Sequence, residues 1–140
     1  MILEGEYLND EKNGKIKEYN CYGELEFEGE YIKGERNGKG KEYRDNELLF
    51  EGEYLKNNRW NGKGKEYFNN RNLLYNGEYK NGKWDGIGKE YYDNGKLKYE
   101  GEFLDGKWNG KGKEYFKNGK IKYDGEFLGG IKIKNKRKKK

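Results

Sequence analysis

Apolar and polar residues alternate along several stretches of the chain, most clearly over residues 97–104. A period of two is that of a β-strand with one buried face. A second, shorter strand is expected at about residues 87–92 and, one repeat later, at 111–116. In residues 97–104 the two alternating sets are Leu97, Tyr99, Gly101 and Phe103, and Lys98, Glu100, Glu102 and Leu104.

Two kinds of connection separate these strands. The Asn94-Gly95 and Asn118-Gly119 pairs favour the positive φ angles of a tight type I′ hairpin turn. The other connection, residues 106–110, is expected to be a longer loop bounded by glycines. Each unit is therefore predicted to be a β-hairpin, and consecutive hairpins form a meander.

This hairpin pattern recurs every 24 residues, marked by Lys-Glu-Tyr triplets and by glycines in the same phase. Fixed periods of this size indicate arrays in which each unit stacks on its neighbours. We expect an array over residues 1–131, with repeats at about 4–27, 28–50, 51–75, 76–99 and 100–123 and a partial repeat at 124–131, and then a basic disordered tail at 132–140. The triplet tyrosines are Tyr19, Tyr43, Tyr67, Tyr91 and Tyr115.

Glycines inside the expected strands need a reason, because each costs roughly 0.5–1 kcal/mol relative to alanine. Close approach of an aromatic ring to bare backbone is the expected reason. We expect Gly101 to lie beneath a tyrosine of a neighbouring strand, and Gly112 to leave space for Phe103 or Trp108. The motif glycines are Gly29, Gly38, Gly40, Gly52, Gly62, Gly64, Gly77, Gly86, Gly88, Gly101, Gly110 and Gly112.

Composition excludes most enzyme chemistry, because the chain has no Ala, Val, Ser, Thr, Gln, His or Pro. Without them there is no Ser-His-Asp or Cys-His arrangement and no His-based or paired-Cys metal site. We therefore predict no catalytic residue, no cofactor and no metal. Glu102 and Glu114 could form a glycosidase-like carboxylate pair, but alternation with lysine fits cross-strand ion pairs on a solvated face better.

The net charge of +5 comes from residues 132–140, which hold seven Lys or Arg and no acidic residue. The remaining body is near neutral, which makes nucleic acid an unlikely partner for it. For the tail, a solvated end, an anionic membrane contact, nucleic acid binding and a nuclear import signal all stay open. The candidate lipid-contacting residues are Lys132, Lys134, Lys136, Arg137, Lys138, Lys139 and Lys140.

The sequence carries neither a leader peptide pattern nor an apolar run of the roughly 18 residues that a membrane helix needs. Its one cysteine, Cys21, cannot form an internal disulfide. We expect a cytoplasmic protein, located at the cytoplasmic face of a membrane if the tail binds lipid.

The repeat resembles that of the MORN family, whose pattern is Y-x-G-x-[aromatic]-x-x-G-x-x-x-G-x-G with a closing glycine. Similar matches begin at Phe27, Phe50 and Tyr75, whereas the first repeat has Ile16 in place of the second glycine. The repeat also resembles the shorter bacterial variant, which occurs in some antitoxins. The residues that carry the match are Tyr99, Gly101, Phe103, Gly106, Gly110, Gly112 and Gly119.

This resemblance implies an all-β fold, an elongated single-layer antiparallel β-meander of about five 24-residue β-hairpin repeats. It also implies a non-catalytic spacer, dimerisation surface or docking platform, for which phospholipid binding has been proposed. We expect a scaffold for protein–protein association or oligomerisation; the alternatives are a peripheral binder of anionic phospholipid through the tail and, more remotely, an antitoxin-like protein. Open sheet edges near residues 2–8 and 121–128 favour self-association. One candidate partner surface is a row of Trp60, Trp84 and Trp108 between strands, with local packing as the alternative.

Overall fold

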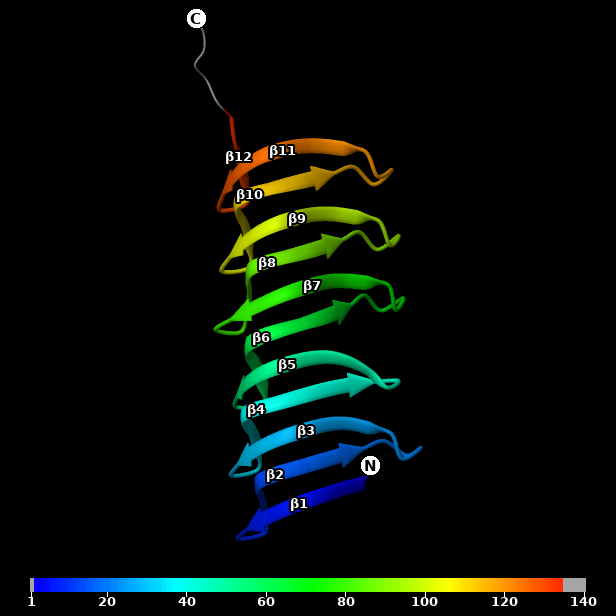
Figure 1. Cartoon of the computed structure of the whole chain (residues 1–140), viewed down its shortest axis with the longest axis vertical. Helices are drawn as coiled ribbons and strands as arrows, with labels where there is room; N and C mark the ends of the chain where they lie inside the picture. Colours follow the sequence, from blue (N-terminus) through cyan, green and yellow to red (C-terminus); the bar gives the residue numbers. More distant parts are fainter. Residues whose placement is uncertain (1, 135–140) are drawn as a thin grey trace, which may run out of the picture. The chain divides into compact units, whose positions relative to one another are not determined.

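The computed structural model describes residues 2–134, and every helix or strand assigned in that range is a β-strand (Figure 1). The chain divides into two compact units, Met1–Gly64 and Lys65–Lys140. The first unit contains β1 (Ile2–Leu8), β2 (Glu11–Tyr19), β3 (Leu25–Ile32), β4 (Glu35–Arg44), β5 (Glu47–Leu55) and most of β6 (Asn58–Tyr67). The second contains β7 (Leu73–Lys80), β8 (Lys83–Tyr91), β9 (Leu97–Leu104), β10 (Lys107–Tyr115), β11 (Ile121–Leu128) and β12 (Ile131–Ile133).

Within each unit, every strand pairs antiparallel with the strands next to it in sequence. The order is β1 to β6 in the first unit and β7 to β12 in the second. The predicted all-β antiparallel meander of hairpin repeats is therefore confirmed. Among residues 2–134 there is no helix with the length and apolar character needed to cross a membrane.

The two kinds of connection are the reverse of the prediction. The tight two-residue turns lie at sites such as Asp105-Gly106, with φ of 51° and 83°, so Trp108 lies inside β10 and not in a loop. The loop after Tyr91 is longer, and of its residues only Gly95 has a positive φ. Asn94 accepts a hydrogen bond from the Lys96 N–H at 2.9 Å, which holds this loop in an Asx turn instead of a type I′ turn.

The C-terminal end of the sheet also differs from the prediction. β12 pairs with β11, so the last described edge is Ile131–Ile133 and not residues 121–128. Lys132 is consequently a strand residue, although the tail was expected to begin there. Residues 135–140, which include Lys136, Arg137, Lys138, Lys139 and Lys140, lie outside the described residues.

One face of each sheet forms the core, and glycines make it possible. Phe27 in β3 and Tyr54 in β5 contact each other edge to face across β4, with ring centroids 5.3 Å apart. Gly40 lies between them, and a Cβ there would be 2.9 Å from the Phe27 ring. Tyr99 and Phe127 meet in the same way across Gly112, at 5.3 Å. The glycine therefore lets rings on alternate strands touch.

The structure confirms a close approach of other atoms to Gly101 and Gly112, but the approaching groups are not the predicted ones. Gly112 leaves space for Tyr99 and not for Phe103 or Trp108. Gly101 faces the backbone of Gly112 and the hydroxyl of Tyr99 on its own strand. Tyr99 extends along its strand and donates a hydrogen bond to the Glu102 carbonyl at 2.8 Å.

The first repeat keeps this core with a smaller side chain at the ring position and a larger one at the glycine position. Leu3 occupies the ring position that Phe27 fills one repeat later, and Ile16 occupies the glycine position of Gly40. Ile16 pairs with Gly5 and Gly29 and is fully buried. Its side chain thus fills space that a ring would occupy, which explains the departure from the repeat pattern.

Candidate functional site

Each Lys-Glu-Tyr glutamate points into the aromatic face, and in the first unit it holds an arginine. Glu18 is buried and accepts hydrogen bonds from the Tyr31 hydroxyl at 2.7 Å and from Arg36 at 3.0 Å. Arg36 also covers the Phe27 ring, with its guanidinium 4.0 Å from the centroid. One arginine therefore closes the ring layer and neutralises the carboxylate below it.

Glu42 repeats the arrangement with Tyr54 at 2.7 Å and Arg59 at 3.1 Å. Burial alone would raise the pKa of Glu42, but the hydrogen bond and charge of Arg59 outweigh it and lower the pKa below its usual value. Burial and the neighbouring Glu42 charge raise the pKa of Tyr54. The Glu42 carboxylate is therefore kept ionised and is hydrogen-bonded to Tyr54 and Arg59.

In the second unit tryptophan takes the place of arginine. Trp84 stacks on Tyr75 with centroids 4.2 Å apart and an interplanar angle of 3°. Its indole N–H donates to Glu66 at 2.9 Å, and the Tyr79 hydroxyl donates to the same oxygen at 2.6 Å. One repeat later, Trp108 stacks on Tyr99 at 4.5 Å and donates to Glu90 at 2.8 Å.

The expected tryptophan row is therefore only partly present. Arg59, which pairs with Tyr54, holds the position of Trp84 and Trp108. Trp60 is an extra residue in the bulge beside it. The stacking of Trp84 and Trp108 supports the local-packing alternative over a partner surface.

The opposite face, called the polar face below, carries charges of alternating sign across the strands. In the first unit, Lys17 and Glu28 are 4.0 Å apart, and Lys41 and Glu51 are 3.8 Å apart. Bare backbone at Gly29, Gly40 and Gly52 contributes to a shallow trough of about 700 Å³ beside this row. Successive members of the row are Glu4, Lys17, Glu28, Lys41, Glu51 and Lys63.

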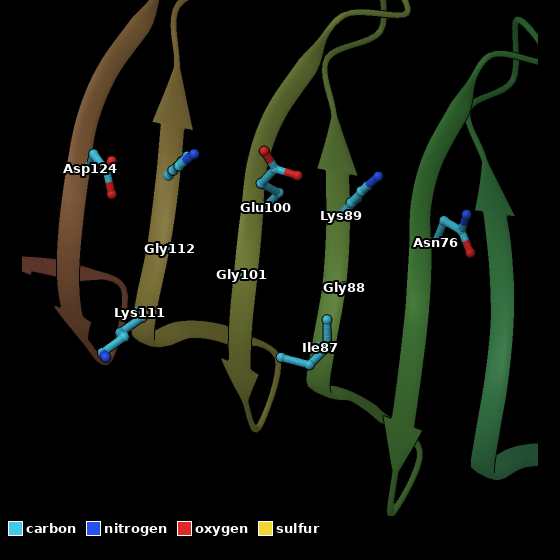
Figure 2. A pocket seen from close by; sticks show the side chains of 10 residues that line it. Asn76, Ile87, Gly88, Lys89, Glu100, Gly101, Lys111, Gly112 and Asp124 are labelled. Carbon is cyan, nitrogen blue, oxygen red and sulfur yellow. The ribbon is translucent and has the colours of Figure 1, made fainter.

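The second unit has a corresponding row and a trough of about 560 Å³ (Figure 2). Glu100 lies between Lys89 and Lys113, and Lys113 faces Asp124. Glu100 also accepts a hydrogen bond from the Tyr115 hydroxyl at 2.6 Å, and this bond is the main cause that raises the pKa of Tyr115 to about 12. We call Asn76, Lys89, Glu100, Lys113 and Asp124 the charge ladder of the second unit.

A second set of glutamates holds bulges in the strands. Gly86 has a φ of 95°, a left-handed conformation that favours glycine. The neighbouring Ile87 N–H donates to the Glu78 carboxylate at 2.9 Å, and Lys39 N–H donates likewise to Glu30 at 3.2 Å. The Gly-Glu-Tyr glutamates therefore stabilise the backbone.

The proposed carboxylate pair is separated by the sheet. Glu102 pairs with Ile87 on the polar face, whereas Glu114 pairs with Tyr99 and Tyr123 on the aromatic face. Glu114 instead lies 3.4 Å from Lys122 and 3.5 Å from Lys132. The two carboxylates therefore cannot flank one substrate bond.

Sequence reasoning missed the carboxylates that point into the aromatic face, of which Glu18 and Glu114 are buried, and the arginines that bind two of the set. A glutamate between lysine and tyrosine is expected to be solvated. Each of these glutamates, however, lies two residues after a core position and therefore points to the same face of the sheet as that position. Glu114, for example, follows Gly112. The members of this set are Glu18, Glu42, Glu66, Glu90 and Glu114, with Arg36 and Arg59. The motif tyrosines Tyr43, Tyr67, Tyr91 and Tyr115 are half-buried.

A MORN repeat family model matches residues 27–47, 50–72, 75–96 and 99–121, together more than half of the chain. Each match begins at a ring residue of the core: Phe27, Phe50, Tyr75 or Tyr99. A search of curated proteins gives no match. MORN repeats are generally associated with scaffolds for protein or membrane interaction, and the family is generally a non-catalytic module. The chain belongs to the MORN repeat family.

Proposed function

We propose that the chain is a non-enzymatic scaffold that mediates protein–protein association, including its own oligomerisation. The observation that carries this proposal is the polar face, where each unit presents a row of alternating charge beside a shallow trough. Rows at the strand spacing of about 4.8 Å fit a partner with a matching order of charges. The side chains of the aromatic face, by contrast, pack against one another within each unit.

The absence of an enzymatic role is also part of the proposal. The buried carboxylate of Glu18 and the half-buried carboxylate of Glu42 each accept hydrogen bonds from a tyrosine and an arginine. These contacts hold both carboxylates in place, and the hydrogen bond and charge of Arg59 lower the pKa of Glu42, whereas a general acid needs a raised pKa and an accessible proton.

The charge ladder of the second unit permits a sharp test. Inverting it with Lys89→Glu, Glu100→Lys, Lys113→Glu and Asp124→Lys keeps opposite charges side by side. It removes one hydrogen bond, from Tyr115 to Glu100, which is worth about 1 kcal/mol, so folding is retained. We expect proteins captured by the parent chain in a pull-down to be lost with the inverted variant. Two results would contradict the proposal. One is equal capture by the parent and the inverted variant. The other is capture by neither, with a parent chain that is strictly monomeric.

A second candidate is binding to an anionic membrane, which the seven basic residues in 132–140 favour. Lys132 is already paired with Glu114 at 3.5 Å, so six charges remain. At about 1 kcal/mol each they bound the attraction at roughly 6 kcal/mol. In this role the protein works at the cytoplasmic face of a membrane.

Co-sedimentation with phosphatidylserine vesicles tests the tail. We expect weak binding that fades as salt screens the charges and disappears when residues 134–140 are deleted, a cut that leaves β12 intact. Binding that survives the deletion would move the lipid site onto the sheet, and no binding by the intact chain would reject this candidate.

A further inference from the structure

β12 brings a cluster of exposed apolar side chains to the C-terminal edge of the second unit. Ile131 lies opposite Leu128, and Ile133 lies opposite Glu126, so both isoleucines are on the polar face. Ile131 is 71% exposed, Ile133 46% and Leu128 65%. These three side chains form an apolar patch at the outermost described strand.

The backbone of Lys132 points away from the sheet at this edge. Lys132 occupies the repeat position of Trp108, whose carbonyl accepts a hydrogen bond from the Gly130 N–H of the next repeat at 2.8 Å. The Trp84 carbonyl accepts one from Gly106 in the same way. Within the described residues no later repeat follows Lys132, so its N–H and C=O, which share one edge of the strand, are presented outward.

A lysine on an edge strand usually blocks pairing, but Lys132 does not guard this edge. Its ammonium is 3.5 Å from Glu114 and 5.4 Å from the centroid of the Tyr123 ring. The charge is therefore folded onto the aromatic face of its own unit. The oxygen that this ammonium faces, Glu114 Oε1, is buried and has no hydrogen-bond partner among the described residues, so it draws the Lys132 charge toward the aromatic face.

We propose that β12 pairs antiparallel with β12 of a second copy, about a twofold axis at Lys132. Ile-Lys-Ile reads the same from both ends, so antiparallel pairing of two copies is self-complementary. Ile131 then lies opposite Ile133 of the second copy, twice, and the two Lys132 residues exchange a pair of backbone hydrogen bonds. This homodimer deepens the proposed function and rests on it for the premise that the chain self-associates.

The N-terminal edge is a poorer partner for itself. In β1, a twofold axis at Gly5 would place Glu4 opposite Glu6 of the second copy. Like charges directly opposite each other destabilise a strand pair, and this axis would create two such glutamate pairs. At β12 the one like pair is Lys132 with Lys132 of the second copy, and each of these ammonium groups lies 3.5 Å from the Glu114 carboxylate of its own chain. The second copy is therefore expected at β12 and not at β1.

Sedimentation equilibrium of the full chain over a wide concentration range tests the interface. The parent should form a dimer, and Ile131→Glu with Ile133→Glu should weaken it at least about tenfold, equivalent to about 1.4 kcal/mol. The matched control is Leu8→Glu, which changes an equally exposed apolar residue on the N-terminal edge and should leave the dimer unchanged.

A backbone variant separates pairing from side-chain effects. Lys132→Pro removes the outward N–H and should abolish the dimer, whereas Lys132→Leu keeps the N–H and should retain it. The Lys132 amide should also gain protection from hydrogen exchange as concentration rises. A dimer that persists in the double glutamate variant would overturn this interface. It would still support the proposal that the chain self-associates. A parent that stays monomeric would also overturn it, and the pull-down with the inverted ladder would still judge the scaffold proposal.

Discussion

The two units solve one packing problem with different side chains. In the first unit, Arg36 covers the ring of Phe27 and binds Glu18. In the second, Trp84 covers the ring of Tyr75 and binds Glu66. Both are flat side chains that carry an N–H donor. The position therefore requires a planar cover and a hydrogen bond to the carboxylate, and it accepts a charged or a neutral group.

A side chain in the space beside the core rings should destabilise both units to a similar extent. Gly40→Val in the first unit and Gly88→Val in the second each place a side chain against a core ring, Phe27 and Tyr75 respectively. Overpacking of this kind should lower the free energy of unfolding by about 3 kcal/mol. Urea denaturation measures it.

The control for this prediction is the neighbouring residue on the polar face. Lys89→Val, one residue from Gly88 but on the opposite face, should change the free energy of unfolding by less than about 0.5 kcal/mol. Equal losses at Gly88 and Lys89 would reject the role assigned to the glycine.

Removing the cover residue should distinguish the units. Trp84→Ala deletes a large, half-buried ring and should cost about 2–3 kcal/mol. Arg59→Ala removes less apolar area but leaves Glu42 without its cation, and should cost about 2 kcal/mol. Thermal unfolding followed by circular dichroism compares the two. The comparison fails if Trp84→Ala is neutral.

The pH dependence of stability should differ between these same variants. The pKa of Glu42 is lowered in the folded state by Arg59, so its stabilisation is present above the unfolded pKa of about 4.3 and is lost as pH falls through the folded pKa. Arg59→Ala should therefore flatten the loss of stability in acid. Trp84→Ala should keep the acid slope of the parent, and an unchanged slope in Arg59→Ala would show that the arginine does not hold Glu42.

Among the changes to the aromatic face, the smallest effect is expected from exchanging the cover residues. Trp84→Arg should change the free energy of unfolding by less than about 1 kcal/mol, because cation–π and aromatic stacking energies overlap in size. A loss as large as that of Trp84→Ala would mean that each unit is specific for its own cover.

The repeat and the meander could be predicted from the sequence because alternation and period are local signals. The turns could not, because an Asn-Gly pair fits several loops and the strand register decides between them. Asn94 shows this, since its side chain accepts the Lys96 N–H and closes a longer loop. Trp108 was consequently placed between strands although it lies in β10.

The polar face was predicted more accurately than the aromatic face. Alternation of lysine and glutamate correctly indicated cross-strand charge rows such as Lys17 and Glu28. The buried set around Glu18 was not found, because its partners Tyr31 and Arg36 lie 13 and 18 residues away in sequence. Only the register brings them together.

The central claim is that the aromatic face holds the fold while the polar face is left for partners. Its most direct test is the unfolding midpoint of the variant with the inverted charge ladder, measured beside Trp84→Ala. Each exposed cross-strand pair contributes about 0.2–1 kcal/mol and is kept in inverted form. Only the hydrogen bond from Tyr115 to Glu100, worth about 1 kcal/mol, is lost, so the inverted variant should melt slightly below the parent and above Trp84→Ala. An inverted variant that melts as low as Trp84→Ala would contradict the account.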